Sequence, residues 1–367
     1  MSTYTIPLAP GVLTINLDAL ARNFHTLCST ATPGECGAVV KANAYGLGIE
    51  HVARRLFAEG CQRFFVASVS EGIELRSILS EIEIYVLEGV QSGQEEAFLI
   101  AGLIPVLNSL EQIRRWRASA SGTSVVVHID TGMSRLGLSA VEVEQVSTEN
   151  LLNELNLEYI ITHLACADEP SHNLTTEQLA RFNALRKKLP DAKTSIGSSP
   201  GILLDAACRG DLVRPGIALY GGNPFISGAN PMEPVVTLEG VILQIREITE
   251  RVTVGYGATH VVKPPARLAT VGVGYADGYP RTLSNCGVVW LAGIEVPVVG
   301  RVSMDLITLD VSEVPTEQVR PGELVELVGS NILLDDVAKA AGTISYEILT
   351  GLSSRWERRY DPEDMEV

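Results

Sequence analysis

One lysine of this chain stands at a position that suits chemistry. The 367 residues include six lysines, and Lys41 is the only one among the first 186. It ends the apolar run of residues 37–40 and precedes small residues, so we expect a strand to deliver it to a loop. A lysine at a strand end is often a plain surface group. The elements around Lys41 must therefore decide between a reactive amine and a solvated one.

Eight short β-rich runs predict the fold that carries Lys41. They alternate with stretches whose apolar residues recur at helical spacing. The predicted strands are 37–40, 64–68, 84–87, 104–108, 125–130, 159–162, 194–197 and 213–219. The predicted helices are 50–59, 71–79, 94–101, 110–118, 141–155, 176–189 and 201–207. This alternation favours an α/β fold, a parallel (β/α)8 barrel of the TIM type.

A second domain is expected where the pattern changes near Pro234. Long alternating runs then follow one another without helices between them. These runs cover residues 235–248, 288–299 and 306–311, and one short helix is expected over 335–341. We therefore predict a barrel domain over residues 1–233 and a mostly β C-terminal domain over residues 234–367.

Polar residues follow several of the predicted barrel strands. They are Lys41, Arg135, His163, Ser198, Ser199 and Arg214. Barrels of this type place their reactive groups at the carboxyl ends of the strands, so these distant segments are expected to meet at one mouth. A single histidine is more often a hydrogen-bonded core residue, and a single arginine more often a salt-bridge partner. Their shared position favours a functional site.

The segment after the eighth predicted strand has the features of a phosphate cup. Residues 214–217 join Ser199 where such barrels commonly bind phosphate through backbone N–H groups. Gly216 has no side chain, so an anion can approach the backbone there. A lysine beside a phosphate cup suggests pyridoxal 5′-phosphate held as a Schiff base. Phosphate cups are common in barrels, so this pattern alone does not identify the ligand.

Composition excludes several classes of partner. The 28 basic and 44 acidic residues give a net charge of −16, which argues against nucleic acids and anionic membranes. No apolar run approaches membrane-spanning length and no leader pattern is present, so we expect a cytoplasmic protein. The six cysteines show no CxxC spacing, which predicts reduced thiols and no metal site.

Six motifs in order resemble those of bacterial alanine racemase, a pyridoxal-phosphate-dependent family of fold type III. They are VVKANAYG (39–46), DTGMSRLG (130–137), THLA (162–165), VRPGIALYG (213–221), GYADGYPR (274–281) and GRVSMD (300–305). The resemblance covers essentially the whole chain. It implies an isomerase that interconverts L-alanine and D-alanine through an external aldimine of the cofactor.

The resemblance implies two bases on opposite faces of the substrate, Lys41 and Tyr275. A tyrosine with an ordinary pKa of about 10 is a poor base at neutral pH, so positive neighbours must help it lose its proton. The family pattern makes His163 and Arg214 that relay, with Tyr275 bonded to His163 and His163 to Arg214. It also places Arg214 on the pyridine nitrogen, which a guanidinium cannot readily protonate.

The remaining site residues are likewise implied by the resemblance. Cofactor binding is expected from Lys41, Tyr45, His163, Ser199, Arg214, Gly216, Ile217 and Tyr220. Substrate binding is expected from Arg135, Met304 and Asp305, with the Met304 backbone and Arg135 on the carboxylate. Members of the family are head-to-tail homodimers, in which Tyr275, Met304 and Asp305 of one chain complete the barrel site of the other.

Three positions depart from the family pattern. His128 stands where many relatives have a lysine, often carbamylated, whose negative charge holds the arginine that corresponds to Arg135. Ser198 replaces an asparagine beside the phosphate serine. The usual Arg-Val-Pro-Arg near the C-terminus reads Arg355-Trp356-Glu357-Arg358, and beside it Ser354 stands where some relatives carry a tyrosine that narrows the substrate pocket. The missing ring at Ser354 leads us to expect activity on serine as well as alanine.

Two other functions share the lysine-bearing barrel. Amino-acid decarboxylases with the same cofactor also have a β domain, but the motifs at 274–281 and 300–305 argue against them. A cofactor carrier without enzymatic activity would have no second domain, and residues 234–367 argue against it. The sequence does not distinguish D-alanine supply for peptidoglycan from alanine catabolism.

Overall fold

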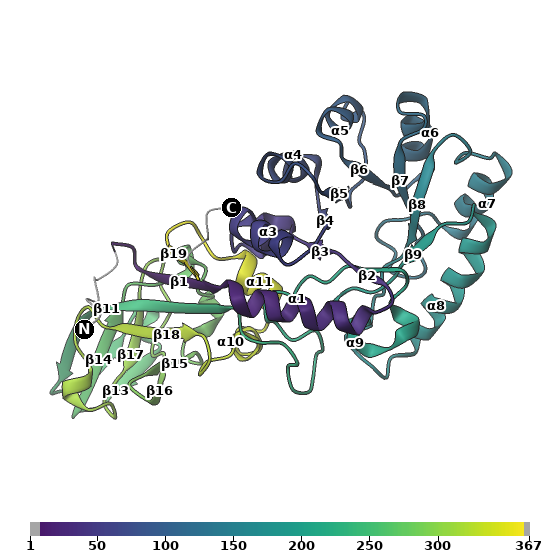
Figure 1. Ribbon diagram of the computed structural model, residues 1–367. Helices are drawn as coiled ribbons and strands as arrows, with labels where there is room; N and C mark the ends of the chain where they lie inside the picture. The colour runs from purple at the N-terminus through teal and green to yellow at the C-terminus, as the bar shows by residue number, and fades with distance from the viewer. Residues whose placement is uncertain (1–7, 363–367) are drawn as a thin grey trace. The chain divides into compact units, whose positions relative to one another are not determined.

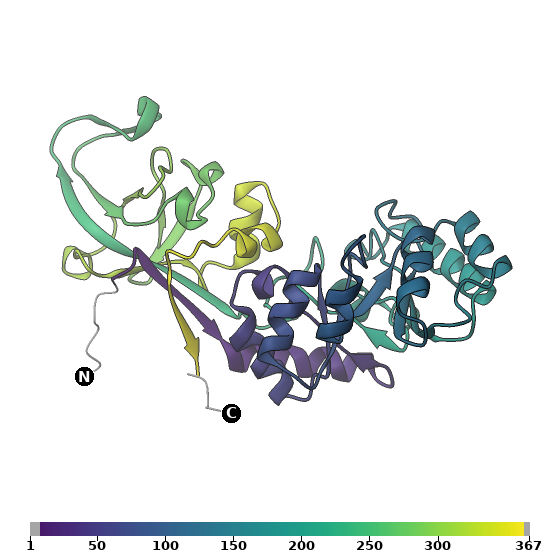
Figure 2. The same cartoon turned by 90° about the horizontal axis from the view of Figure 1, so that it is seen from above.

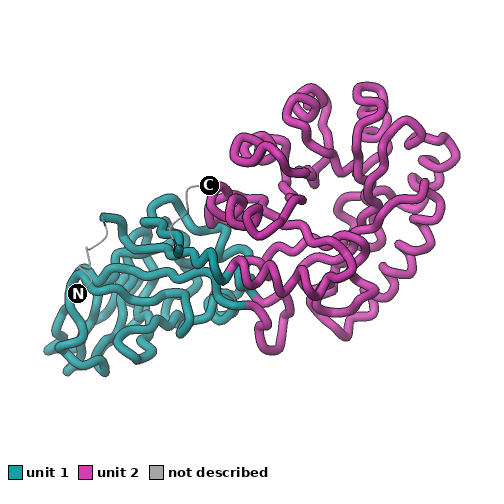
Figure 3. The backbone as a smooth tube through the Cα atoms, viewed as in Figure 1, with its two compact units in different colours: residues 1–19, 220–222, 233–367 teal, residues 20–219, 223–232 magenta. Residues whose placement is uncertain are grey.

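The computed structural model describes residues 8–362, and these divide into two compact units. Residues 20–219 and 223–232 form a barrel unit, and residues 8–19, 220–222 and 233–362 form a β-rich unit (Figure 3). No helix within residues 8–362 is long and apolar enough to cross a bilayer.

The barrel unit is built on a parallel sheet whose strands follow the chain in order. The strands are β3 (Ala38–Val39), β4 (Arg63–Val66), β5 (Glu83–Val86), β6 (Ile104–Leu107), β7 (Ser124–His128), β8 (Asn156–Ile161) and β9 (Lys193–Ser195). Each pairs in parallel with the next. All but the terminal residues of most strands are buried, because helices cover the outer face.

Two short strands join the ends of this sheet. β10 (Leu212–Val213) pairs in parallel with β2 (Glu35–Cys36), which continues through Gly37 into β3. On its other side, Arg214 N donates to Gly197 O, 2.7 Å away, just beyond β9. The expected TIM-like arrangement is therefore present. The last strand ends at Val213 and not at Leu219, because Pro215 has no N–H to continue a ladder.

Helices surround the strands, as Figure 1 shows. They are α1 (Leu17–Ala31), α2 (Lys41–Tyr45), α3 (Ile49–Ala58), α4 (Val69–Ile78), α5 (Glu95–Ala101), α6 (Leu110–Ser119), α7 (Ala140–Thr148), α8 (Asn173–Leu185) and α9 (Ser199–Leu204), with 3-10 turns η1 (Arg186–Lys188) and η2 (Ala206–Cys208). Ser68, Ser109 and Ser139 cap α4, α6 and α7, each accepting a bond from the amide three residues later. Helix α1 was not predicted, although its buried Leu17, Leu20, Phe24 and Leu27 have helical spacing.

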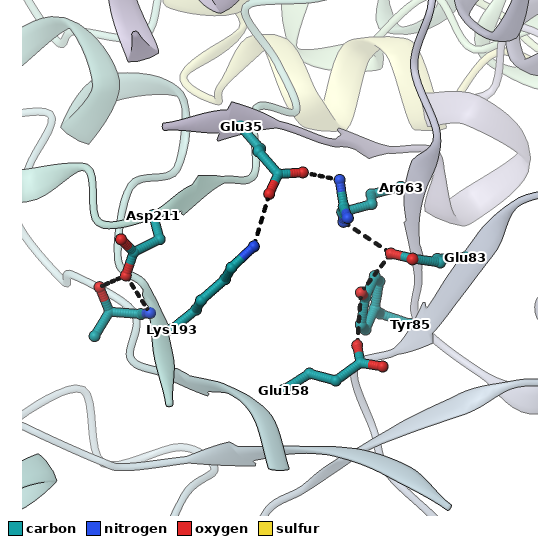
Figure 4. Close-up of polar contacts among 8 residues, drawn as sticks. Glu35, Arg63, Glu83, Tyr85, Glu158, Lys193 and Asp211 are labelled. Carbon is teal, nitrogen blue, oxygen red and sulfur yellow. Dashed lines mark hydrogen bonds and ion pairs between the residues drawn. The ribbon is translucent and has the colours of Figure 1, made fainter. Parts of the chain in front are cut away.

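Charged residues connect five strands at the amino-terminal end of the barrel (Figure 4). Glu35 of β2 forms ion pairs with Arg63 of β4 and with Lys193 of β9. Arg63 also lies 2.8 Å from a Glu83 oxygen. The hydroxyl of the fully buried Tyr85 lies 2.9 Å from Glu83 and 3.0 Å from Glu158 of β8. Burial and these two carboxylates raise the pKa of Tyr85, which therefore stays protonated as a donor.

The β-rich unit has a mostly antiparallel sheet in the order β16-β15-β18-β11-β1-β19, with β14 on β11 and β17 on β14. Its strands are β1 (Gly11–Asn16), β11 (Val236–Ile248), β14 (Ala266–Val271), β15 (Val288–Leu291), β16 (Ile294–Pro297), β17 (Ile307–Asp310), β18 (Leu324–Val328) and β19 (Glu357–Asp361). A separate hairpin pairs β12 (Val252–Val254) with β13 (His260–Val262). Four 3-10 turns are η3 (Tyr256–Ala258), η4 (Tyr275–Asp277), η5 (Arg281–Leu283) and η6 (Thr316–Gln318).

Two helices also belong to this unit, α10 (Leu334–Ala341) and α11 (Ser345–Thr350). The first confirms the helix expected over residues 335–341. A single boundary after residue 233 does not separate the two units. Strand β1, at the start of the chain, belongs to the β-rich unit because it pairs with β11 and β19. Figure 2 shows β1 between these two strands. Val12, Leu13 and Ile15 are fully buried there, which a solitary N-terminal strand could not achieve.

Candidate active site

Lys41 lies two residues after the end of β3, at the carboxyl end of the barrel strands. Burial lowers the pKa of its amine, and the positive charge of Arg135 lowers it further. The carboxylates of Glu71 and Glu88 act in the opposite direction. A lowered pKa leaves more of the amine neutral at physiological pH, which is the form that attacks an aldehyde or accepts a proton.

The backbone of α2 after Lys41 is not a right-handed helix but a left-handed turn. Residues 42–45 have φ values of 53°, 54°, 52° and 56°. Each left-handed non-glycine residue costs about 1–2 kcal/mol. The turn is closed by bonds from Ala44 N to Val40 O (2.8 Å) and from Gly46 N to Ala42 O (2.7 Å). Strain of this kind persists only where the surroundings impose it, and it commonly marks a functional site.

The same turn places Tyr45 against Gly216. The tyrosine ring is buried, and a Cβ at residue 216 would lie 2.1 Å from the Tyr45 hydroxyl oxygen. Only glycine fits at this position without displacing the ring. Lys41 and Tyr45 are therefore the two ends of one strained turn, and Tyr45 closes on the segment that follows β10.

Ser199 and the backbone after β10 form one hydrogen-bonded cluster. The Ser199 hydroxyl oxygen accepts bonds from Gly216 N (2.9 Å) and Ala218 N (3.2 Å). Because it accepts both, its own proton is left to donate. Ser199 is 2% exposed and Ile217 is fully buried beside these amides. Backbone amides, a hydroxyl and a glycine without Cβ suit a phosphate group, so the residues present fit pyridoxal phosphate.

Arg214 is a buried cation in the barrel. Its guanidinium donates to the Ser195 hydroxyl (2.5 Å) and to Thr162 O (2.8 Å). Burial lowers its pKa to about 10, so it remains charged at neutral pH. Burial and the Arg214 charge together lower the pKa of His163 to about 3, which leaves that imidazole neutral. Within residues 8–362, no hydrogen bond joins His163 to Arg214, so that part of the expected relay stays a prediction.

The tautomer of His128 follows from its partner, Asn108. Both amide protons of Asn108 are used, 3.0 Å from Leu87 O and 2.8 Å from Val106 O. Its side-chain oxygen therefore accepts from His128 Nδ1 at 2.8 Å, and that nitrogen carries the proton. Burial lowers the pKa of His128 to about 4, so the ring is neutral and Nε2 is an acceptor. A neutral acceptor thus occupies the position where the family resemblance led us to expect an anion.

An aspartate organises the loop that carries Arg135. The Asp130 carboxylate accepts bonds from the amides of Gly132 (2.9 Å), Met133 (2.9 Å) and Ser134 (3.1 Å). Burial alone would raise the pKa of Asp130, but these amide bonds lower it below its usual range. The Asp130 carboxylate therefore stays ionised and keeps these three hydrogen bonds at neutral pH. Only in acid would its protonation release the loop.

In the β-rich unit, two motifs distant in sequence lie side by side. Tyr275 N donates to Ser303 O (3.0 Å) and Ala276 N to Met304 O (2.9 Å). The side chains of Tyr275 and Met304 are 43% and 54% exposed. These are high values for large side chains, so this face presents a phenol and an apolar side chain outward.

An arginine that the sequence pattern did not single out for a role connects these motifs. Arg355 lies 3.0 Å from an oxygen of the fully buried Asp277 and donates to Asp305 at 2.7 Å. The indole of Trp356 donates to Asp277 O (2.7 Å). Arg355 therefore holds the two motifs together, through Asp277 of one motif and Asp305 of the other. The signal available in the sequence was an acidic residue inside each motif, Asp277 and Asp305.

The expected site residues are divided between the units. The barrel unit holds Lys41, Tyr45, Arg135, His163, Ser199, Arg214, Gly216 and Ile217, and the β-rich unit holds Tyr220, Tyr275, Met304 and Asp305. Within the barrel unit, the residues lie after β3, β7, β8, β9 and β10, all at the carboxyl ends of strands. This is the end at which barrel enzymes place their chemistry.

Comparison with known proteins agrees with this arrangement. Residues 15–224 match the family described as alanine racemase, N-terminal domain, and residues 235–360 match alanine racemase, C-terminal domain. The alanine racemase of Rhodospirillum rubrum is 46% identical over 359 residues, covering 96% of each chain. The catabolic alanine racemase of Agrobacterium fabrum is 46% identical over 358 residues, covering 96% of this chain and 92% of the relative. The structure of alanine racemase from Bartonella henselae with covalently bound pyridoxal phosphate superposes with a TM-score of 0.91 at 38% identity, covering 96% of this chain and 100% of that one. The chain belongs to the alanine racemase family.

Proposed function

We propose that this protein is an alanine racemase that uses pyridoxal 5′-phosphate at the carboxyl end of the barrel. The observation that carries the proposal is the half-buried Lys41, with its lowered pKa, in the same barrel mouth as the donors of Ser199, Gly216 and Ala218. When bound, the cofactor withdraws electrons from the amino acid and so acidifies its α-proton.

The residues of the barrel unit have complementary tasks in this proposal. Ser199, Tyr45 and the amides after Arg214 hold the phosphate, and Arg214 supplies a permanent positive charge at the cofactor ring. Arg135 holds the substrate carboxylate as a bidentate cationic donor. Lys41, once free, takes or returns the α-proton on one face. Its lowered pKa makes the neutral amine available for this at physiological pH.

We further propose that the second base, Tyr275, comes from another copy of the chain in a head-to-tail homodimer. The exposure of Tyr275 and Met304 on the β-rich unit supports this, because such groups are usually covered. Met304 and Asp305 of that copy would complete the shared site, and Tyr220 would belong to the phosphate cup with Tyr45 and Ser199. A cytoplasmic location and a role in D-alanine supply for peptidoglycan or in alanine catabolism belong to the same proposal. Growth of a deletion strain only with added D-alanine would favour the supply role.

Chiral chromatography of the purified, cofactor-loaded protein tests this function. The protein is incubated separately with L-alanine, L-serine and L-lysine, and the D-enantiomers are measured. We expect alanine to approach an equal mixture of enantiomers, with serine slower. Racemisation of another amino acid but not of alanine would show that the enzyme acts on that amino acid instead. The absence of any racemisation would instead favour the decarboxylase or the cofactor-carrier function.

The size of the substrate pocket is tested at Ser354, an exposed residue of the β-rich unit. We expect Ser354→Tyr to lower kcat/KM for serine by about tenfold relative to alanine, because the added ring restricts the hydroxymethyl group. Both substrates are assayed with the same preparation, so alanine turnover controls for folding. Equal serine specificity in the two proteins would show that residue 354 does not limit the pocket.

A further inference from the structure

One carboxylate outside the assigned residues is bonded to the turn that follows Lys41. Glu71 is the third residue of α4. Its Oε1 accepts a bond from Ala42 N at 2.8 Å, and its Oε2 accepts one from Ala67 N at 2.7 Å. The two oxygens thus connect the segment that follows β3 with the segment that follows β4. One of the two donors, Ala42, is the residue next to Lys41.

The local sequence around Glu71 would suggest a simpler role. Ser68 and Glu71 have the spacing of a capping box, in which the glutamate bonds back to the amide of the serine. At α7 this box is closed, because Glu142 accepts from Ser139 N at 2.8 Å. At α4 the serine hydroxyl accepts from Glu71 N at 3.4 Å, but the carboxylate is directed to Ala67 and Ala42 instead. Glu71 therefore serves the turn as well as its own helix.

Two side-chain bonds tie the left-handed turn of residues 42–45 to its surroundings. Glu71 binds its first amide, and the Asn43 side-chain oxygen accepts from Ile49 N at 2.8 Å. Four consecutive left-handed residues are strained, so the turn depends on such anchors to keep its shape. A relaxed turn would displace Lys41 at one end and Tyr45 at the other.

Glu71 also belongs to the charges that surround the Lys41 amine. Arg135 favours the neutral amine, whereas Glu71 and Glu88 favour the protonated one. The Lys41 charge in turn contributes to the lowered pKa of His163. Of the two carboxylates, Glu71 is the one bonded to the residue that follows Lys41.

We propose that Glu71 is a positioning residue for Lys41, which anchors the left-handed turn through Ala42 and adds a negative charge to the surroundings of the Lys41 amine. The inference rests on the proposed function, because the position of the Lys41 amine matters only if Lys41 reacts. Its geometry and its electrostatic effect can nevertheless be measured on the protein alone.

The test compares Glu71→Gln with wild type and with Glu142→Gln as the matched control. Glu142 is also the third residue of a barrel helix and also accepts a backbone amide, but at a different helix. The rate of acetylation of Lys41 by acetic anhydride is measured against pH by mass spectrometry on the cofactor-free protein. Lys41 is the only lysine among the first 186 residues, so its peptide is unambiguous. Lys193 in the same sample serves as the internal reference.

We expect the midpoint of the Lys41 profile to move to lower pH in Glu71→Gln, because a charge that favours the protonated amine is removed. The profile of Lys193 should not move, and Glu142→Gln should match wild type. The dissociation constant for pyridoxal phosphate, followed by the visible absorption of the bound cofactor, should rise by about tenfold in Glu71→Gln but not in Glu142→Gln. Glu71→Asp keeps the charge but cannot span both amides, so it should weaken binding with a smaller change in the pH profile.

An unchanged Lys41 profile in Glu71→Gln would overturn the proposal, even if cofactor binding weakened, because a purely structural anchor would give that result. Circular dichroism of each variant establishes that the fold is retained. If wild-type protein neither binds pyridoxal phosphate nor racemises alanine, the proposed function fails. The acetylation profiles still decide the role of Glu71 in that case.

Discussion

Lys41→Ala is expected to remove both the visible absorption of bound pyridoxal phosphate and at least about a thousandfold of the racemase activity. Without the amine there is no covalent link to the cofactor and no proton carrier on one face of the substrate. Absorbance of the cofactor-loaded protein and chiral chromatography measure the two losses. Lys193→Ala is the control, because Lys193 lies at the opposite end of the barrel, paired with Glu35.

Retained visible absorption in Lys41→Ala would assign the covalent link to another lysine. The outcome is easily interpreted because lysines are so few, and Lys41 alone lies at the carboxyl end of a barrel strand. Loss of absorption with full retention of racemisation would separate the cofactor link from catalysis and contradict the proposed mechanism. The melting temperature should change little, since the left-handed turn is held by backbone bonds and by Glu71.

Tyr275→Phe is expected to keep the visible absorption yet lower racemisation in both directions by about 10²–10⁴-fold. The substitution removes only the hydroxyl. The turn remains anchored by the bonds from Tyr275 N to Ser303 O and from Ala276 N to Met304 O. Initial rates from L-alanine and from D-alanine provide the measurement. Tyr256→Phe is the control, because Tyr256 is another exposed tyrosine of the same unit, at 72% exposure. Unchanged rates in Tyr275→Phe would remove this hydroxyl from the mechanism.

The two variants together test whether the site is shared between chains. If Tyr275 acts on the Lys41 of a second copy, a hybrid of Lys41→Ala and Tyr275→Phe chains contains one intact site. Mixing the two inactive proteins under conditions that exchange subunits should then restore about a quarter of the wild-type activity, since half of the dimers are hybrids with one site of two intact. No restoration despite verified exchange would place both bases in the same chain.

The sequence pattern predicted the barrel well because the signal is local. Short buried strands and 3.6-residue spacing are properties of neighbouring residues, so the strands from β3 to β9 and the position of Lys41 could be read directly. The motif beginning at Gly274 and the one beginning at Gly300 could likewise be matched to a family without knowing their contact. Strand β10 was predicted too long, because apolar residues after Pro215 are buried without being part of a strand.

The sequence by itself therefore determined the class of fold, the family and the candidate reactive residues, since these depend on residue type, periodicity and motif order. Only the tertiary structure decided how these residues are held. The left-handed turn after Lys41, the bond from Ala42 to Glu71 and the proton on His128 Nδ1 depend on contacts between segments that lie 20 to 30 residues apart. The pairing of β1 with β11 joins residues more than two hundred positions apart. Such contacts arise only when the chain is packed, because no local preference of alanine, histidine or glutamate specifies them.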